Sequence, residues 1–206
     1  MDLIDISRPL SPATAVWPGD QPVEWRWTAQ IQEGSTVNLG AIQLSTHAGS
    51  HVDAPRHVRT DGESTDAFEL SAFIGPVEVV AVEEDQIRPR HVAEVTTPRV
   101  LFKTSASALS ADEWPDSITS LHPETVSALD ASGAVLMGTD APSVDPLDST
   151  SLPAHHALID ADIVNLEGLA LDHVDPGRYR LVALPLKVQG ADAAPVRAAL
   201  INDQNQ

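Results

Sequence analysis

Proline and glycine divide this chain into many short elements. Sixteen prolines and eleven glycines are spread over 206 residues, and both interrupt regular structure. Between them lie apolar or β-branched runs of strand length, at 37–46, 76–82, 99–103, 134–138, 162–168 and 180–186. Helix signals are fewer, at 122–133 and 152–162, with a weaker one at 88–95. We therefore expect a single α/β domain over 1–206 with a mixed sheet, and fraying of the polar end, 201–206.

Charge excludes two classes of partner. Twelve basic residues face thirty acidic ones, giving a formal net charge of −18. A nucleic-acid phosphate backbone needs a basic face, and an anionic membrane surface attracts basic segments, so we expect neither partner. No stretch approaches the 18 apolar residues of a membrane span. The N-terminal segment, acidic and without an apolar core, does not resemble a secretory signal, so we expect a cytoplasmic protein.

The segment 45–57, STHAGSHVDAPRH, gathers three histidines and an aspartate within eleven residues. On an ideal strand His47, His51, Asp53 and His57 would share one face, but a four-residue step spans roughly 13 Å. On a helix, Asp53 would point away from the first two histidines. We therefore expect an irregular segment leaving the strand at 37–46, bent at glycine and proline.

These residue types predict a metal site. The chain has no cysteine, so any metal must bind histidine and carboxylate ligands, the set of an open catalytic site for Zn²⁺ or, with more oxygen ligands, Mn²⁺. The alternative is that these are loop histidines with solvent-facing and capping roles. His155 and Glu167 offer a second pair, although taken alone a surface histidine and a turn glutamate explain this pair better. If they do take part, Asp53 has two oxygens with which to bridge two ions.

The run from His47 to His57 resembles the metal-binding motif of the cyclase family of metal-dependent hydrolases. Ser50 stands where threonine is usual and keeps the hydroxyl group. The segments WPGD (17–20), LPLK (184–187) and APVRA (194–198) resemble, more narrowly, the kynurenine formamidases (arylformamidases) of that family.

The resemblance implies a swivelling β/β/α fold, a homodimer, and hydrolysis of the small-molecule substrate N-formyl-L-kynurenine to L-kynurenine and formate in tryptophan catabolism. It implies two zinc ions per subunit, held by the metal ligands His47, His51, Asp53, His155 and Glu167. Asp53 would bridge the ions, and His155 is preferred to His156 because the family spacing to the glutamate is twelve. His57 would carry protons, and Trp17 would lie against the substrate ring.

Two other functions stay open on the sequence. One is a cyclase-family hydrolase of another small aromatic or cyclic amide, such as an isatin-like lactam. The other is a non-enzymatic protein that binds metal.

Several further residues have no clear assignment from the sequence. Trp17 also suits ordinary core packing, and the i, i+2 pair Trp25 and Trp27 is expected in the core or an interface. Trp114 reads as a loop residue without a function. Asp140 and Ser143, after the strand at 134–138, could support the site in a role that the sequence does not define.

Overall fold

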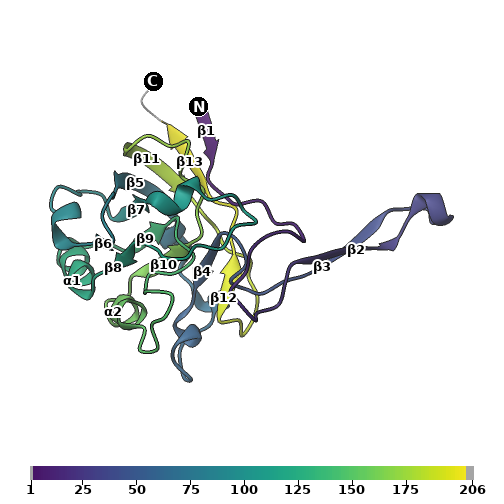
Figure 1. Ribbon diagram of the computed structural model, residues 1–206, viewed down its shortest axis with the longest axis horizontal. Coiled ribbons are helices and arrows are strands. Elements are labelled where there is room, and N and C mark those ends of the chain that lie inside the picture. The colour runs from purple at the N-terminus through teal and green to yellow at the C-terminus, as the bar shows by residue number, and fades with distance from the viewer. Residues whose placement is uncertain (1, 203–206) are drawn as a thin grey trace.

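Four parallel strands form the centre of a curled, nine-stranded mixed sheet in the computed structural model, which describes residues 2–202 (Figure 1). Antiparallel strands flank this centre on both sides. In sheet order the strands are β1 (Asp2–Asp5), β13 (Ala199–Asn202), β11 (Gly177–Val182), β5 (Ile74–Ala81), β7 (Arg99–Lys103), β9 (Leu136–Thr139), β10 (Val164–Glu167), β4 (His51–Asp53) and β12 (Ala193–Pro195).

Two helices cover one face of the sheet. They are α1 (Pro123–Ala131) and α2 (Pro153–Asp160), and each begins with proline, whose missing amide hydrogen costs nothing in the first turn. Short 3₁₀ turns connect other elements: η1 (Ile31–Glu33), η2 (Pro55–His57), η3 (Thr65–Ala67), η4 (Leu70–Phe73), η5 (Pro89–His91) and η6 (Ser105–Ala108). A small parallel pair, β6 (Gln86–Ile87) and β8 (Ser120–Leu121), lies on the α1 side (Figure 1).

The apolar core has two parts because side chains alternate across the sheet. On β7, Val100 and Phe102 pack with the helices, through residues such as Leu129 of α1 and Leu158 of α2. Leu101 of the same strand points to the other face, where the curled sheet encloses a second cluster. Strands buried on both faces read as continuous apolar runs, which is why the central strands were visible in the sequence.

One pair of strands leaves the body of the molecule. β2 (Glu24–Ala29) and β3 (Leu39–Gln43) form an antiparallel ribbon that extends far from the sheet (Figure 1). Trp25 and Trp27 lie on this ribbon, 49% and 47% exposed, in an edge-to-face pair with ring centroids 5.0 Å apart. Within this chain they are therefore not core residues, and the expectation of an interface remains.

The expected elements correspond closely to those observed at the centre of the sheet and less closely elsewhere. The strand expected at 99–103 is β7 with the same bounds, whereas the one expected at 180–186 begins earlier, as β11. The weak helix at 88–95 is only the 3₁₀ turn η5. Of the tail expected to fray, residues 201 and 202 belong to β13 and pair with β1, while 203–206 lie outside the described residues. None of the helices within 2–202 is long and apolar enough to cross a bilayer.

Candidate metal centre and active site

Strands β4 and β10 place four polar side chains on one face of the sheet. The antiparallel register sets His51 opposite Glu167 and Asp53 opposite Asn165. The alternate residues, Val52 and Leu166, point into the core on the other face. Glu167 ends β10, so the cluster lies at the carboxyl end of a parallel strand, where α/β sheets commonly bind ligands.

Turns on either side of β4 bring the other two histidines back to this cluster. Gly49, with φ of 67°, bends the chain between His47 and His51. After Asp53, the 3₁₀ turn η2 returns His57 until its ring centroid is 4.2 Å from that of His47. The prediction of a wholly irregular segment is therefore wrong in part: His51 and Asp53 lie on a strand, and only the outer histidines lie on turns. A three-residue strand paired on both sides has too little sequence to show a periodicity.

A second glycine allows the two chain segments to approach. Gly168 follows Glu167 with φ of 65°, and a Cβ atom there would lie 2.3 Å from the carbonyl oxygen of Gly49. Ser50 Oγ donates a hydrogen bond of 2.7 Å to the Gly168 carbonyl oxygen. This contact fixes the end of β10, and with it Glu167, against the turn that carries the histidines.

His155 reaches the cluster from the first turn of α2. It is 5% exposed, whereas His156 points outward. The Asp145 carboxylate accepts hydrogen bonds from the backbone amides of Ala154 and His155, at 2.9 and 3.1 Å, and so satisfies amides that the first helical turn leaves free. The same carboxylate lies 2.7 Å from His155 Nδ1, which directs Nε2 toward the cluster.

Asp53 lies between two groups of donor atoms. Its Oδ1 is 3.1 Å from His47 Nδ1 and 3.4 Å from His51 Nε2. Its Oδ2 is 3.4 Å from His155 Nε2. Glu167 spans the same gap, with Oε2 3.5 Å from His51 Nε2 and Oε1 3.4 Å from His155 Nε2. The structure thus brings together all five residues that the sequence analysis named as ligands.

The donor set fits divalent cations. His51 Nε2 and Asp53 Oδ1 are buried and have no hydrogen-bond partner within residues 2–202, a costly arrangement unless something else binds them. Metal-binding histidines usually donate the remaining ring N–H to an oxygen. Here His51 Nδ1 lies 3.0 Å from the Gly49 carbonyl oxygen, and His47 Nε2 lies 3.1 Å from Asp192. Asp145 holds Nδ1 of His155 in the same way. Each of these three rings therefore has one nitrogen held by an oxygen atom and the other directed toward the cluster.

The charges of the cluster show what a cation would replace. Burial alone would lower the pKa of His51, but the adjacent carboxylates of Asp53 and Glu167 outweigh it and raise that pKa to about 10. Burial also opposes charge on His155, yet Asp145 and the two inner carboxylates raise its pKa to about 12. Without metal, protons on these rings balance the buried carboxylates, and a cation would take over that role.

The pKa of His57 is shifted in the opposite direction from those of His51 and His155. Burial lowers its pKa below the ordinary histidine value, with the nearby positive rings of His47 and His155 acting in the same direction against the attraction of Asp53. A neutral imidazole at neutral pH can accept a proton. His57 also lies within reach of Asp53 and His155 as a third donor.

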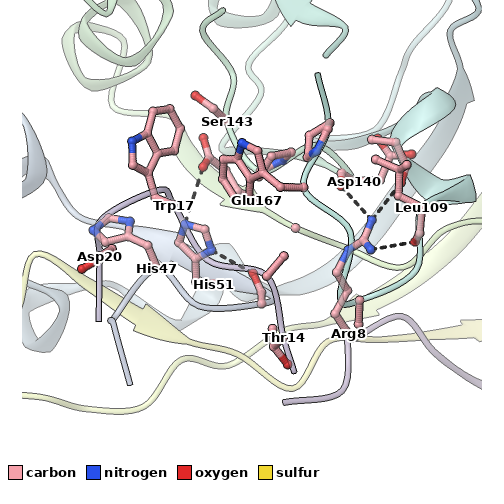
Figure 2. Close-up of a pocket in the computed structure, with 18 of the residues that line it drawn as sticks. Arg8, Thr14, Trp17, Asp20, His47, His51, Leu109, Asp140, Ser143 and Glu167 are labelled. Atoms are coloured by element: carbon pink, nitrogen blue, oxygen red, sulfur yellow. Dashed lines mark hydrogen bonds and ion pairs between the residues drawn. The ribbon is translucent and has the colours of Figure 1, made fainter. Parts of the chain in front are cut away.

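A cavity of about 400 Å³ opens over the cluster. Its lining includes His47, His51, His57, His155 and Glu167. Figure 2 shows Trp17 above His47 and His51, while Arg8 on the other side reaches the backbone of Leu109 and Asp140. Trp17, 42% exposed, therefore lines the cavity and is not a core residue. A flat, partly exposed indole offers a surface for an aromatic ligand.

Trp114 was missed as a site residue. It lines the same cavity and packs edge-to-face on Trp17, with centroids 5.4 Å apart. It lies in an irregular segment, where no periodicity predicts the direction of a side chain. Asp140 and Ser143 also line the cavity. The Asp140 carboxylate is occupied by Thr104 and Ser107, so it shapes the wall of the cavity.

Three histidines outside the cluster, His91, His122 and His173, have local partners. The His173 side chain is 47% exposed, with Nδ1 2.8 Å from Asp172. His122 caps α1 by accepting from the Glu124 amide. The His91 side chain is only 11% exposed and lies against Glu84.

Comparison with known proteins identifies the family. The Cyclase family model matches residues 4–146. The chain belongs to the cyclase family. A curated member, the kynurenine formamidase of Salinibacter ruber, is 59% identical over 97% of both chains. Among solved structures, a predicted metal-dependent hydrolase from Bacillus stearothermophilus has a TM-score of 0.81 at 26% identity, covering 97% of both chains. Isatin hydrolase A from Labrenzia aggregata has a TM-score of 0.83 at 24% identity, over 98% of this chain and 94% of that one, and shows the shared fold. The expected fold and family are thereby confirmed, and the protein is a hydrolase.

Proposed function

We propose that this chain hydrolyses N-formyl-L-kynurenine to L-kynurenine and formate, a step of tryptophan catabolism. The 59% identity to the Salinibacter ruber kynurenine formamidase over nearly the whole chain carries the choice of substrate. The histidine and carboxylate cluster beneath an aromatic-walled cavity supports the reaction class, since hydrolysis of an amide needs an activated water and the substrate carries a phenyl ring.

The proposed cofactor is a pair of Zn²⁺ ions, with Mn²⁺ as the alternative. His47, His51 and Asp53 would hold one ion, and His155, Glu167 and the second oxygen of Asp53 the other. The opposed contacts of the two Asp53 oxygens support this division. When bound, such cations activate water and polarise a carbonyl oxygen. Metal analysis of the purified chain tests both the identity of the ion and the number bound.

His57 is the proposed acid and base. Its lowered pKa leaves it neutral and able to take a proton from the attacking water. The water oxygen adds to the formyl carbon, the C–N bond breaks, formate leaves, and His57 returns the proton to the aniline nitrogen. Trp17 would hold the phenyl ring while these transfers occur.

A spectrophotometric assay with N-formyl-L-kynurenine and isatin, with and without chelator, tests the proposal. We expect chelator-sensitive deformylation and little opening of the lactam. Activity on isatin alone would instead make the chain a hydrolase of cyclic amides, the second function left open by the sequence. Inactivity on both substrates by metal-replete protein would favour the non-enzymatic alternative.

The proposed assembly is a homodimer. The exposed apolar residues of the β2–β3 ribbon support it, because Trp25, Trp27 and Ile42 expose large surfaces well away from the rest of the chain. Sedimentation of the wild type and of Trp25→Ser/Trp27→Ser tests this: a wild-type monomer would refute the dimer, and a variant that remains fully dimeric would refute the role of the ribbon. The cytoplasm remains the expected compartment, and cell fractionation is its test.

A further inference from the structure

Asp192 is brought to the site by an edge strand. It directly precedes β12, which pairs with β4 so that Ala193 lies opposite Asp53. The Asp192 carbonyl oxygen accepts a hydrogen bond of 2.8 Å from the amide of Ala54. This backbone pairing places the Asp192 side chain beside the two turns that carry His47 and His57.

The Asp192 carboxylate contacts both of those histidines through one oxygen. Oδ2 lies 3.1 Å from His47 Nε2 and 3.7 Å from His57 Nδ1. The other oxygen, Oδ1, accepts a hydrogen bond of 3.0 Å from Thr46 Oγ1, which limits rotation of the carboxylate. Both histidines line the cavity, whereas Asp192 is not among the described residues that do so.

The contacts of Asp192 differ from those that hold the rings of His155 and His51. Asp145 holds His155, and the Gly49 carbonyl oxygen holds His51, so each fixes a single proposed ligand. Asp192 instead stands between a ring whose Nδ1 faces Asp53 and a ring that faces the open cavity. Moving one carboxylate would therefore disturb both the binding of metal and the placement of the base.

We propose that Asp192 is a positioning residue that sets the metal ligand His47 and the acid–base residue His57 at a fixed separation, through Oδ2, with Thr46 holding the carboxylate in place. The proposal rests on the proposed function for the role of His57, and on geometry alone for the hold on His47. Partners of metal-binding histidines typically contribute 10- to 100-fold to metal affinity or activity.

The test uses the full chain with Asp192→Ala, Asp192→Asn and Thr46→Val. Metal affinity is measured by chelator competition, and kcat and KM are measured at saturating metal. We expect Asp192→Ala to weaken metal binding about 10- to 100-fold and to lower kcat about tenfold or more, with KM changed less than threefold. Asp192→Asn keeps an oxygen acceptor for His47 and should recover most of the affinity, but not kcat. Thr46→Val should lower kcat a few-fold with the bound metal unchanged.

Asp66→Ala is the matched control. Asp66 accepts a hydrogen bond of 3.1 Å from the Gly190 amide, so it anchors the turn that leads into Asp192. Its hydrogen-bond partners, Ser64 and Gly190, are not histidines. It should leave metal affinity and kcat near the wild-type values. Equal losses in Asp66→Ala and Asp192→Ala would overturn the proposal, because loosening of the turn would then explain both.

Two further results would contradict the proposal. Wild-type affinity and kcat in Asp192→Ala would show that the carboxylate positions nothing. Loss of one metal ion per chain at saturation would make Asp192 a ligand instead. If the wild type does not deformylate N-formyl-L-kynurenine while Asp192→Ala still weakens metal binding, the proposed substrate fails and the hold on His47 stands.

Discussion

Asp145 Oδ2 and His155 Nδ1 are 2.7 Å apart, and both residues are buried. The carboxylate accepts from the ring, so His155 keeps its proton on Nδ1 and directs Nε2 at Asp53 and Glu167. The same carboxylate accepts from two amides at the start of α2. One side chain therefore fixes both the helix that carries a proposed ligand and the orientation of that ligand.

Asp145→Ala should consequently affect both metal binding and folding. We expect metal affinity to fall about 10- to 100-fold, and the free energy of unfolding of the metal-free protein to fall by about 1–3 kcal/mol, because buried donors lose their acceptor. Chelator competition and urea denaturation measure the two effects. Asp148→Ala, at an exposed position nearby, should change neither. Unaltered metal binding in Asp145→Ala would show that the contact does not orient a ligand.

Metal binding should release protons. The pKa values of His51 and His155 are raised to about 10 and about 12 in the metal-free protein, so both rings are charged at pH 8 and must become neutral to bind metal. We expect release of about two protons per chain at pH 8, and an affinity that rises with pH. Titration calorimetry in buffers of different ionisation enthalpy measures this release. His156→Gln should leave it unchanged, whereas binding without proton release would contradict the assigned charges.

The same raised pKa values predict how the stability of the metal-free fold depends on pH. Unfolded histidine has a pKa of about 6.5, so these protonated rings stabilise the metal-free fold fully below that pH. The stabilisation is lost as the pH rises through about 10 for His51 and about 12 for His155. Thermal unfolding of the metal-free protein should thus move to lower temperature between pH 7 and pH 10, and a transition temperature that rose over this range would be inconsistent with the buried pairs.

The tryptophan pair should govern substrate binding. Trp17→Ala removes the flat surface over the cluster and should raise KM for N-formyl-L-kynurenine about tenfold, since about 1.4 kcal/mol corresponds to that factor. Trp114→Ala removes the support of Trp17 and part of the cavity wall and should raise KM about threefold, while Trp17→Phe should stay near wild type. Trp25→Ala serves as a control, because its ring lies on the β2–β3 ribbon. Equal KM values in Trp17→Ala and the wild type would exclude this ring contact.

Substitutions of His57 and His51 should have different effects on bound metal and on turnover. His57→Ala should lower kcat about 10²- to 10⁴-fold and keep its metal, because proton transfer typically contributes that much. His51→Ala should lose both metal and activity, since its Nε2 lies among the inner carboxylates. Metal content and turnover measured on the same preparations distinguish the two. A His57→Ala protein that has lost a metal ion would identify His57 as a ligand.

The centre of the fold was predictable from sequence, because strands buried on both faces show as apolar runs. β7 was located this way, α2 was located from its helix signals, and Gly49 correctly indicated a bend. β4 was not predicted, because three residues are too few to show the alternation of side chains that indicates a strand. Its strand character comes from long-range pairing with β10 and β12.

The partners of the site were less predictable than its proposed ligands. The motif at 47–57 supplies histidines at a recognisable spacing. Asp145 and Asp192 are single carboxylates among thirty acidic residues, and only the tertiary fold brings them to ring nitrogens. Asn165 likewise donates to Asp53 and Glu167, at 3.0 and 2.8 Å, because of strand register.

Titration of metal-free protein with Zn²⁺, following deformylation of N-formyl-L-kynurenine and bound metal together, tests the central claim most directly. We predict no activity without metal and a rise that saturates as the site between β4 and α2 is filled, at two ions per chain. Full deformylation by protein shown to be free of metal would contradict the account, as would inactivity of the metal-saturated chain.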